Sequence, residues 1–119
     1  MWLAFLVMTL GAATLTVVGW FAWLGKLPRQ GFAGIRTPYT MASDEQWHAA
    51  HRFGAPYLIF GGVAGVAIGL AGLPFAIAGE LPDAFAAASL LAAAGILLVS
   101  ALASWYFGVR GAKAHLGQQ

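Results

Sequence analysis

Residues 55–79 read APYLIFGGVAGVAIGLAGLPFAIAG, without a single charged side chain. As an α-helix this run would extend about 37 Å, more than the hydrocarbon core of a bilayer at about 30 Å. Runs 2–25 and 84–109 are equally free of Asp, Glu, Lys and Arg. Only 8% of the chain is charged and 61% is hydrophobic, too few polar residues to cover a small water-soluble domain. The sequence predicts an all-α integral membrane protein, a single domain 1–119 with three transmembrane helices at about 2–25, 55–79 and 84–109.

The distribution of basic residues predicts the orientation. They lie in the first loop, 26–54, and in the C-terminal tail, while the loop 80–83 has none: Lys26, Arg29, Arg36, Arg52, Arg110 and Lys113. Basic loops remain cytoplasmic, so we expect a multi-pass membrane protein with its N-terminus outside and its C-terminus cytoplasmic. The first apolar run exceeds the core of about 7 to 15 residues in a signal peptide, and we expect it to stay attached.

Small residues predict how the helices pack. Four glycines of the second run follow one helical face: Gly61, Gly65, Gly69 and Gly72. Such a face lets another helix approach closely, either the third run of the same chain, through Ala88, Ala92 and Gly95, or a helix of another protein. We expect Ser100 and Ser104, one turn apart, to bond back to the carbonyls of their own helix rather than to line a pathway. The absence of ionisable groups inside the runs argues against pumps, proton-coupled transporters and ion pathways.

The first loop has local signals of its own. Pro28 and Pro38 predict an irregular segment, and Ser43 with Gln46 three residues later predicts a helix N-cap. We expect a short interfacial helix from Asp44 to about Phe53, ending at a joint formed by Gly54 and Pro56, with Trp47 at the membrane surface.

The loop sequence resembles a known family. Gly34-Ile-Arg-Thr-Pro-Tyr-Thr, then Ser43-Asp-Glu-Gln-Trp and His51-Arg-Phe-Gly, is similar to the signature of the SdpI family of bacterial membrane proteins, here in a short form, because the best-known members have additional membrane segments before the signature. The resemblance implies immunity to a secreted peptide toxin and, in signalling, the holding of a transcriptional repressor at the membrane. It directs attention to eight signature positions: Gly34, Ile35, Arg36, Thr37, Pro38, Trp47, His51 and Arg52.

Individual side chains of the loop allow alternatives. Arg36 could bind an acidic partner or a lipid phosphate, or pair internally with Asp44 or Glu45. Glu45, His48 and His51 have the spacing of helical metal ligands, but a single such cluster without cysteine is a weak signal, and interfacial hydrogen bonding explains it better. We predict no metal site and no cofactor. Since no nucleophile, base and oxyanion signature occurs, we also predict that the protein is not an enzyme.

Two kinds of function fit these observations. The chain could be an immunity or signalling protein that binds partners through its cytoplasmic loop and helix faces, or an accessory or stabilising subunit of a larger bacterial membrane complex such as a transporter or respiratory assembly. The expected partners are the lipid bilayer, another membrane protein or a cytoplasmic regulator and, by resemblance, a peptide toxin. We expect no direct contact with nucleic acid.

Overall fold

The fold is all-helical, as the sequence predicts. The computed structural model describes residues 2–28 and 34–117, which form α1 (Trp2–Trp23), α2 (Asp44–Ile77) and α3 (Asp83–His115). All three helices are long and apolar enough to cross a membrane, by length and composition. The molecule is an elongated bundle 54 Å long.

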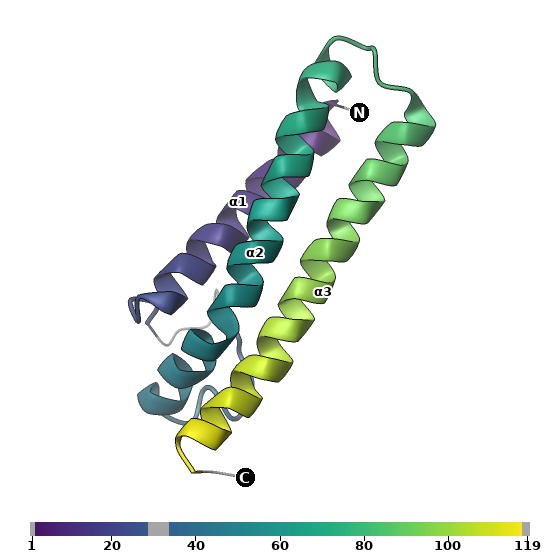
Figure 1. Ribbon diagram of the computed structural model, residues 1–119. Helices are drawn as coiled ribbons and strands as arrows, with labels where there is room; N and C mark the ends of the chain where they lie inside the picture. The colour runs from purple at the N-terminus through teal and green to yellow at the C-terminus, as the bar shows by residue number, and fades with distance from the viewer. Residues whose placement is uncertain (1, 29–33, 118–119) are drawn as a thin grey trace.

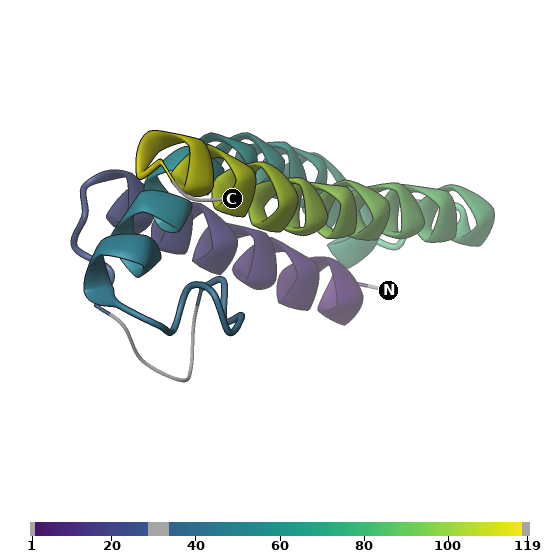
Figure 2. The ribbon, with the colours of Figure 1, turned by 90° about the horizontal axis from the view of Figure 1, so that it is seen from below.

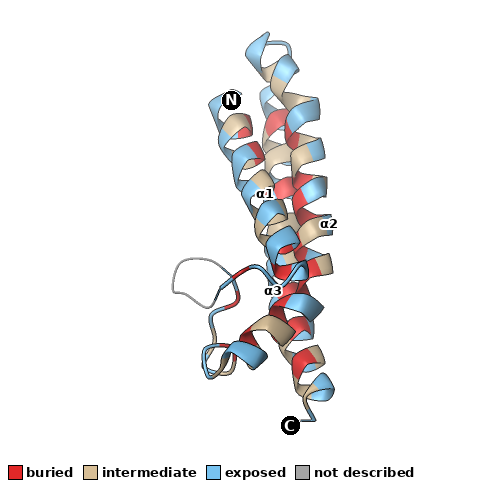
Figure 3. Ribbon diagram, turned by 90° about the vertical axis from the view of Figure 1, so that its left-hand side faces the viewer, coloured by how far each residue is buried: buried red, intermediate tan, exposed pale blue. Residues whose placement is uncertain are grey.

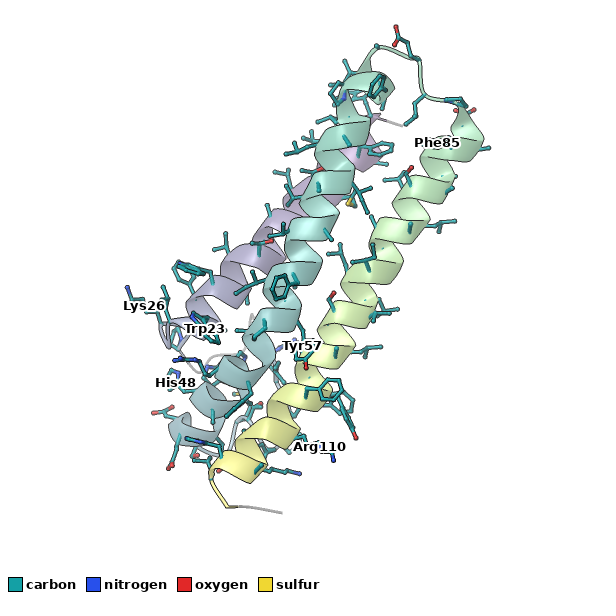
Figure 4. All side chains as sticks on the ribbon, in the orientation of Figure 1. Trp23, Lys26, His48, Tyr57, Phe85 and Arg110 are labelled. Carbon is teal, nitrogen blue, oxygen red and sulfur yellow. The ribbon has the colours of Figure 1, made fainter. Side chains whose placement is uncertain are left out.

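The middle helix organises the bundle. α2 packs against both α1 and α3, whereas α1 and α3 touch each other at few points. Figure 1 shows the N-terminus beside the α2–α3 connection at one end, and the C-terminus beside the α1–α2 connection at the other. We call the second of these the loop end. Lys26, His48 and Arg110 lie there, far from Phe85 at the opposite end (Figure 4).

The helices differ in length, and the difference is concentrated at the loop end. α1 has 22 residues, α2 has 34 and α3 has 33, so α2 and α3 each extend about 50 Å against about 33 Å for α1. α3 continues to His115, past the predicted limit at residue 109. The additional turns of α2 and α3 therefore project beyond α1 and provide a surface for the loop.

The start of α2 follows from its cap. Ser43 has an extended backbone, and its Oγ accepts a hydrogen bond from the backbone N–H of Gln46 at 3.1 Å. Asp44 and Glu45 place negative charge in the first turn, where it favours the helix dipole. The Gln46 side chain also donates to the carbonyl of Tyr39 at 3.1 Å. The predicted N-cap is confirmed, and it ties the loop to the helix.

The prediction of a separate short helix is wrong. α2 runs without interruption through Gly54 and Pro56 to Ile77. Pro56 lacks a backbone N–H, which bends a helix without having to end it, and Figures 2 and 3 show the first turns of α2 inclined to the rest. Gly54 is buried against α3, where an added Cβ would lie 2.6 Å from Ser104 Oγ. It thus allows close helix packing and is not a joint.

The glycine face of α2 packs within the chain. An added Cβ at Gly65 would lie 2.8 Å from Ala12 Cβ of α1 and 3.1 Å from Leu97 Cδ2 of α3. The other three glycines make similar close approaches: Gly61 to Ser100, Gly69 to Thr9 and Gly72 to Phe5. Three of the four therefore face α1, and the two helices approach more closely than larger side chains would allow.

The face of α3 that meets α2 differs from the predicted one. Ala88, Ala92 and Gly95 are exposed, while the buried residues of α3 lie on another side of the helix: Ala86, Ala93, Ser104, Gly108 and Ala112. Small residues occur on both faces, so composition alone could not choose between them. Figure 3 shows the buried positions gathered between the helices.

Candidate functional site

Trp47 anchors the loop to the helices. Its side chain is fully buried among Ala22, Leu27 and Ala55, and its Nε1–H donates to the carbonyl of Leu27 at 2.8 Å. Its position at the membrane surface stays a prediction; the indole itself faces the protein, where it finds both an apolar pocket and a hydrogen-bond acceptor at the end of α1. Trp47 therefore joins α1, the loop and α2.

His51 lies one turn further along and is also buried. Its Nε2 accepts the backbone N–H of Ile35 at 2.7 Å, which leaves Nδ1–H to donate to the carbonyl of Trp47 at 2.7 Å. The rings of Trp47 and His51 are 4.1 Å apart between centroids. Both ring nitrogens are thus committed to the backbone, which requires the neutral imidazole.

The electrostatics of His51 agree with this arrangement. His51 precedes the apolar run 55–79, and burial lowers its pKa, with a hydrogen bond to Trp47 acting in the opposite direction and the charge of His48 adding to the lowering. Metal binding with Glu45 and His48 would require His51 to give up a backbone hydrogen bond. Within the described residues, no group of three or more His, Asp or Glu side chains is placed to hold a metal ion.

Gly34 is where the loop comes closest to His51. Its φ is +99°, in the region that favours glycine, and an added Cβ would collide with His51 Nε2 and lie 3.1 Å from Leu27 Cδ2. The next residue, Ile35, is buried and donates the hydrogen bond to His51. The Gly-Ile pair and the histidine therefore form one packing unit across 16 positions of sequence.

The segment after Ile35 closes on itself through two threonines. Thr40 is fully buried, and its Oγ1 donates to the carbonyl of Ile35 at 2.7 Å and accepts from the backbone N–H of Thr37 at 2.9 Å. In return, Thr37 Oγ1 accepts the backbone N–H of Thr40 at 3.1 Å. This reciprocal pairing turns the chain at Pro38. Neither Thr40 nor Leu27 was among the candidate residues. The spacing of three between Thr37 and Thr40 is the sequence signal that could have identified Thr40.

The remaining motif residues point outward. Arg36 and Pro38 are exposed, Met41 is 40% exposed, and Tyr39 lies under the ammonium group of Lys113, which is 5.1 Å from its ring centroid. Arg52, also exposed, places its guanidinium carbon 4.2 Å from the ring centroid of Trp23, a cation–π contact between α2 and the end of α1.

The eight candidate residues therefore separate into two groups. Ile35, Trp47 and His51 are internal and Gly34 is fixed against them, whereas Arg36, Pro38 and Arg52 present polar or rigid groups to the outside. Thr37 joins the two groups through its bonds to Thr40. The described part of the loop is held on α1 and α2 by hydrogen bonds of Trp47 and His51.

Comparison with known proteins identifies the loop and the helices after it. The model of the SdpI/YfhL protein family matches residues 26–112, which is more than half of the chain and contains all eight candidate residues. No curated protein and no solved structure gives a significant match.

Proposed function

We propose that this chain, which belongs to the SdpI/YfhL protein family, is a non-enzymatic protein of the bacterial plasma membrane that acts in immunity to a secreted peptide toxin, or in signalling its presence. It works by binding a partner on the outer face of the loop, which we define as Arg36, Pro38 and Met41. The membrane character rests on the three apolar helices and the family.

The observation that carries this proposal is the division of the loop into internal and external residues. Four residues of the loop and α2 are buried and hydrogen-bonded: Ile35, Thr40, Trp47 and His51. The segment is therefore ordered before a partner binds, and binding does not carry the entropic cost of ordering it. The outer face is thereby presented in a fixed shape. A preformed exposed surface suits recognition.

The same geometry supports a non-enzymatic role. His51 is only 1% exposed, and its two nitrogens bond to the backbone of Ile35 and Trp47. It has no nitrogen available to a substrate, although a general base must reach the proton that it removes.

The charge distribution supports a cytoplasmic partner. Among the described residues, the basic side chains belong to the loop end, whereas Glu80 and Asp83 flank the opposite connection. If basic segments stay inside, the outer face of the loop is cytoplasmic, as a regulator would require. The accessory-subunit alternative loses one argument, because the glycine face on which it depends is covered by α1 and α3.

The orientation can be tested with single cysteines, since the chain has none of its own. In intact cells, Met41→Cys should resist a membrane-impermeant thiol reagent and Leu81→Cys should react. The reverse labelling pattern would place the loop outside and remove the cytoplasmic-partner proposal.

Partner binding can be tested by photocrosslinking in native membranes. A photoreactive residue at Met41 should give a discrete protein adduct that weakens in the Arg36→Ala variant, while the same residue at Leu91, which is 73% exposed on α3, should not. Adduct formation with a regulatory protein supports the proposal, and a subunit of a stable membrane complex favours the alternative. Absence of any discrete adduct at Met41 contradicts both.

Immunity has its own measurement. Cells without this gene should grow more slowly than the parent in spent medium that contains the secreted toxin, and wild-type protein should restore growth. Equal growth of the deletion strain and the parent would eliminate the immunity role.

A further inference from the structure

A groove runs between the two helices that touch least. α1 and α3 meet at few points, and the space between them is a cavity of about 480 Å³ that is open at the side. Most of its walls are apolar: Gly11, Leu15 and Val18 of α1, Leu58 of α2, and Ala101 and Trp105 of α3. The groove thus lies along the parts of the helices that are expected to be in the membrane.

The polar groups of the groove gather at its loop end. Residues 34–37 close it there, and Arg36 contributes the only charged side chain among the described residues that line it. Ser104, in the opposite wall, is fully buried, and its hydroxyl has no hydrogen-bond partner within the described part of the chain. The expected hydrogen bond from Ser104 back to its own helix is therefore not formed; its hydroxyl lies against Gly54 of α2, where an added Cβ would be 2.6 Å away. The hydroxyl of Thr14, by contrast, already bonds to the carbonyl of Leu10 at 2.8 Å.

We propose that this groove binds one anionic phospholipid, with the phosphate at Arg36 and an acyl chain along the apolar walls. The groove has a cation at one end and hydrocarbon along its length, which is the complement of such a lipid. A guanidinium group is suited to phosphate because it can donate two parallel hydrogen bonds. The cytoplasmic leaflet, where the loop end is expected to lie, carries negatively charged lipids.

The size of the groove favours a lipid chain over a protein helix. The volume of about 480 Å³ is within the range of roughly 300–1,000 Å³ for small-molecule sites. A membrane-spanning helix about 10 Å across and about 30 Å long would occupy roughly 2,400 Å³. Such a helix could lie across the mouth of the groove but could not enter it.

Two glycines provide a matched test of occupancy. Gly11 lines the groove and Gly95 lies on the exposed side of α3, and at each position an added Cβ would meet no other described atom within 4 Å. Leucine should be accommodated at both sites, but only Gly11→Leu places a side chain in the path of the acyl chain. Ala101→Leu, which enlarges the facing wall, is a second variant in case Gly11→Leu does not fold.

The experiment is native mass spectrometry of protein in mild detergent, titrated with dioleoylphosphatidylglycerol or, separately, dioleoylphosphatidylcholine. The wild type and Gly95→Leu should each saturate at one phosphatidylglycerol per chain. The affinity of Gly11→Leu and Ala101→Leu for phosphatidylglycerol should be lower by about tenfold or more. Arg36→Ala should lose about tenfold in affinity for phosphatidylglycerol and little for phosphatidylcholine. Arg36→Ala affects both this site and the outer face of the loop, whereas Gly11→Leu leaves the outer face intact and should still give the Met41 adduct, so the groove-filling variants separate the two proposals.

Two results would overturn the proposal. Equal or unsaturable phosphatidylglycerol binding by the groove-filling variants and Gly95→Leu would mean that the lipid binds elsewhere. A photoreactive residue at Ala101 that forms protein adducts in native membranes, and no lipid adducts, would mean that the groove faces a partner protein.

Discussion

Replacement of Gly34 by alanine tests the central contact of the loop. At a φ of +99°, any residue with a Cβ is strained by roughly 1–2 kcal/mol. The added methyl would also collide with His51 Nε2 and so break the hydrogen bond from Ile35, leaving buried polar groups unpaired at a further cost of about 1–3 kcal/mol. We therefore expect Gly34→Ala to destabilise the loop by about 2–5 kcal/mol, a large fraction of the roughly 5–15 kcal/mol that stabilises most domains.

Gly25→Ala separates the two contributions. Gly25 also has a positive φ, +72°, but an added Cβ there would meet no described atom within 4 Å. This variant should show only the backbone strain of roughly 1–2 kcal/mol. The additional effect in Gly34→Ala then measures the contact with His51.

Trypsin cleavage after Arg36 is a suitable assay. The side chain of Arg36 is exposed, but the residue before it is buried and hydrogen-bonded to His51, so we expect cleavage to require local opening of the segment. If Gly34→Ala destabilises the loop by about 2 kcal/mol or more, its cleavage rate should exceed that of the wild type at least about 30-fold. Equal cleavage rates in Gly34→Ala and Gly25→Ala would refute the idea that His51 holds the loop.

Three further predictions concern the loop and the packing of α1 on α2. Thr40→Val should destabilise the loop by about 1–3 kcal/mol, measured by amide hydrogen exchange, and Thr40→Ser should restore most of the protection; no difference between the two would contradict a role for the hydroxyl. Because burial lowers the pKa of His51, the contribution of its neutral ring to the stability of the loop is fully present above pH 6.5 and is lost as the pH falls below that value. The rate of trypsin cleavage after Arg36, corrected for the pH dependence of trypsin itself, should therefore rise below pH 6.5, and a rate independent of pH would count against the neutral ring. Gly69→Leu should separate α1 from α2 and lower the thermal stability in detergent, whereas Gly95→Leu should not, and equal melting curves would contradict the close packing.

Several features of the fold could be predicted from sequence because they depend on composition and local order. The helices were predictable from three runs without charge, and the N-cap at Ser43 from the position of Gln46. The continuity of α2 was not, because Gly54 and Pro56 are also common where helices end. Its reason is tertiary: Gly54 packs against Ser104 of α3, and helix packing stabilises a continuous, bent helix where Pro56 alone would favour a break.

The burial of Trp47 and His51 could not be predicted for a related reason. A helical wheel gives the direction of each side chain around α2, but not which direction faces the protein, because in a membrane both sides can be apolar. The deciding contact is with the carbonyl of Leu27, 20 positions away in sequence. The dense similarity to the SdpI family over the loop is thus explained largely by internal structure, since Gly34, Ile35, Trp47 and His51 fit one another. Differences in specificity between proteins with this loop should therefore be sought at exposed residues outside the shared signature, such as Met41, and not at the buried ones that hold the loop in place.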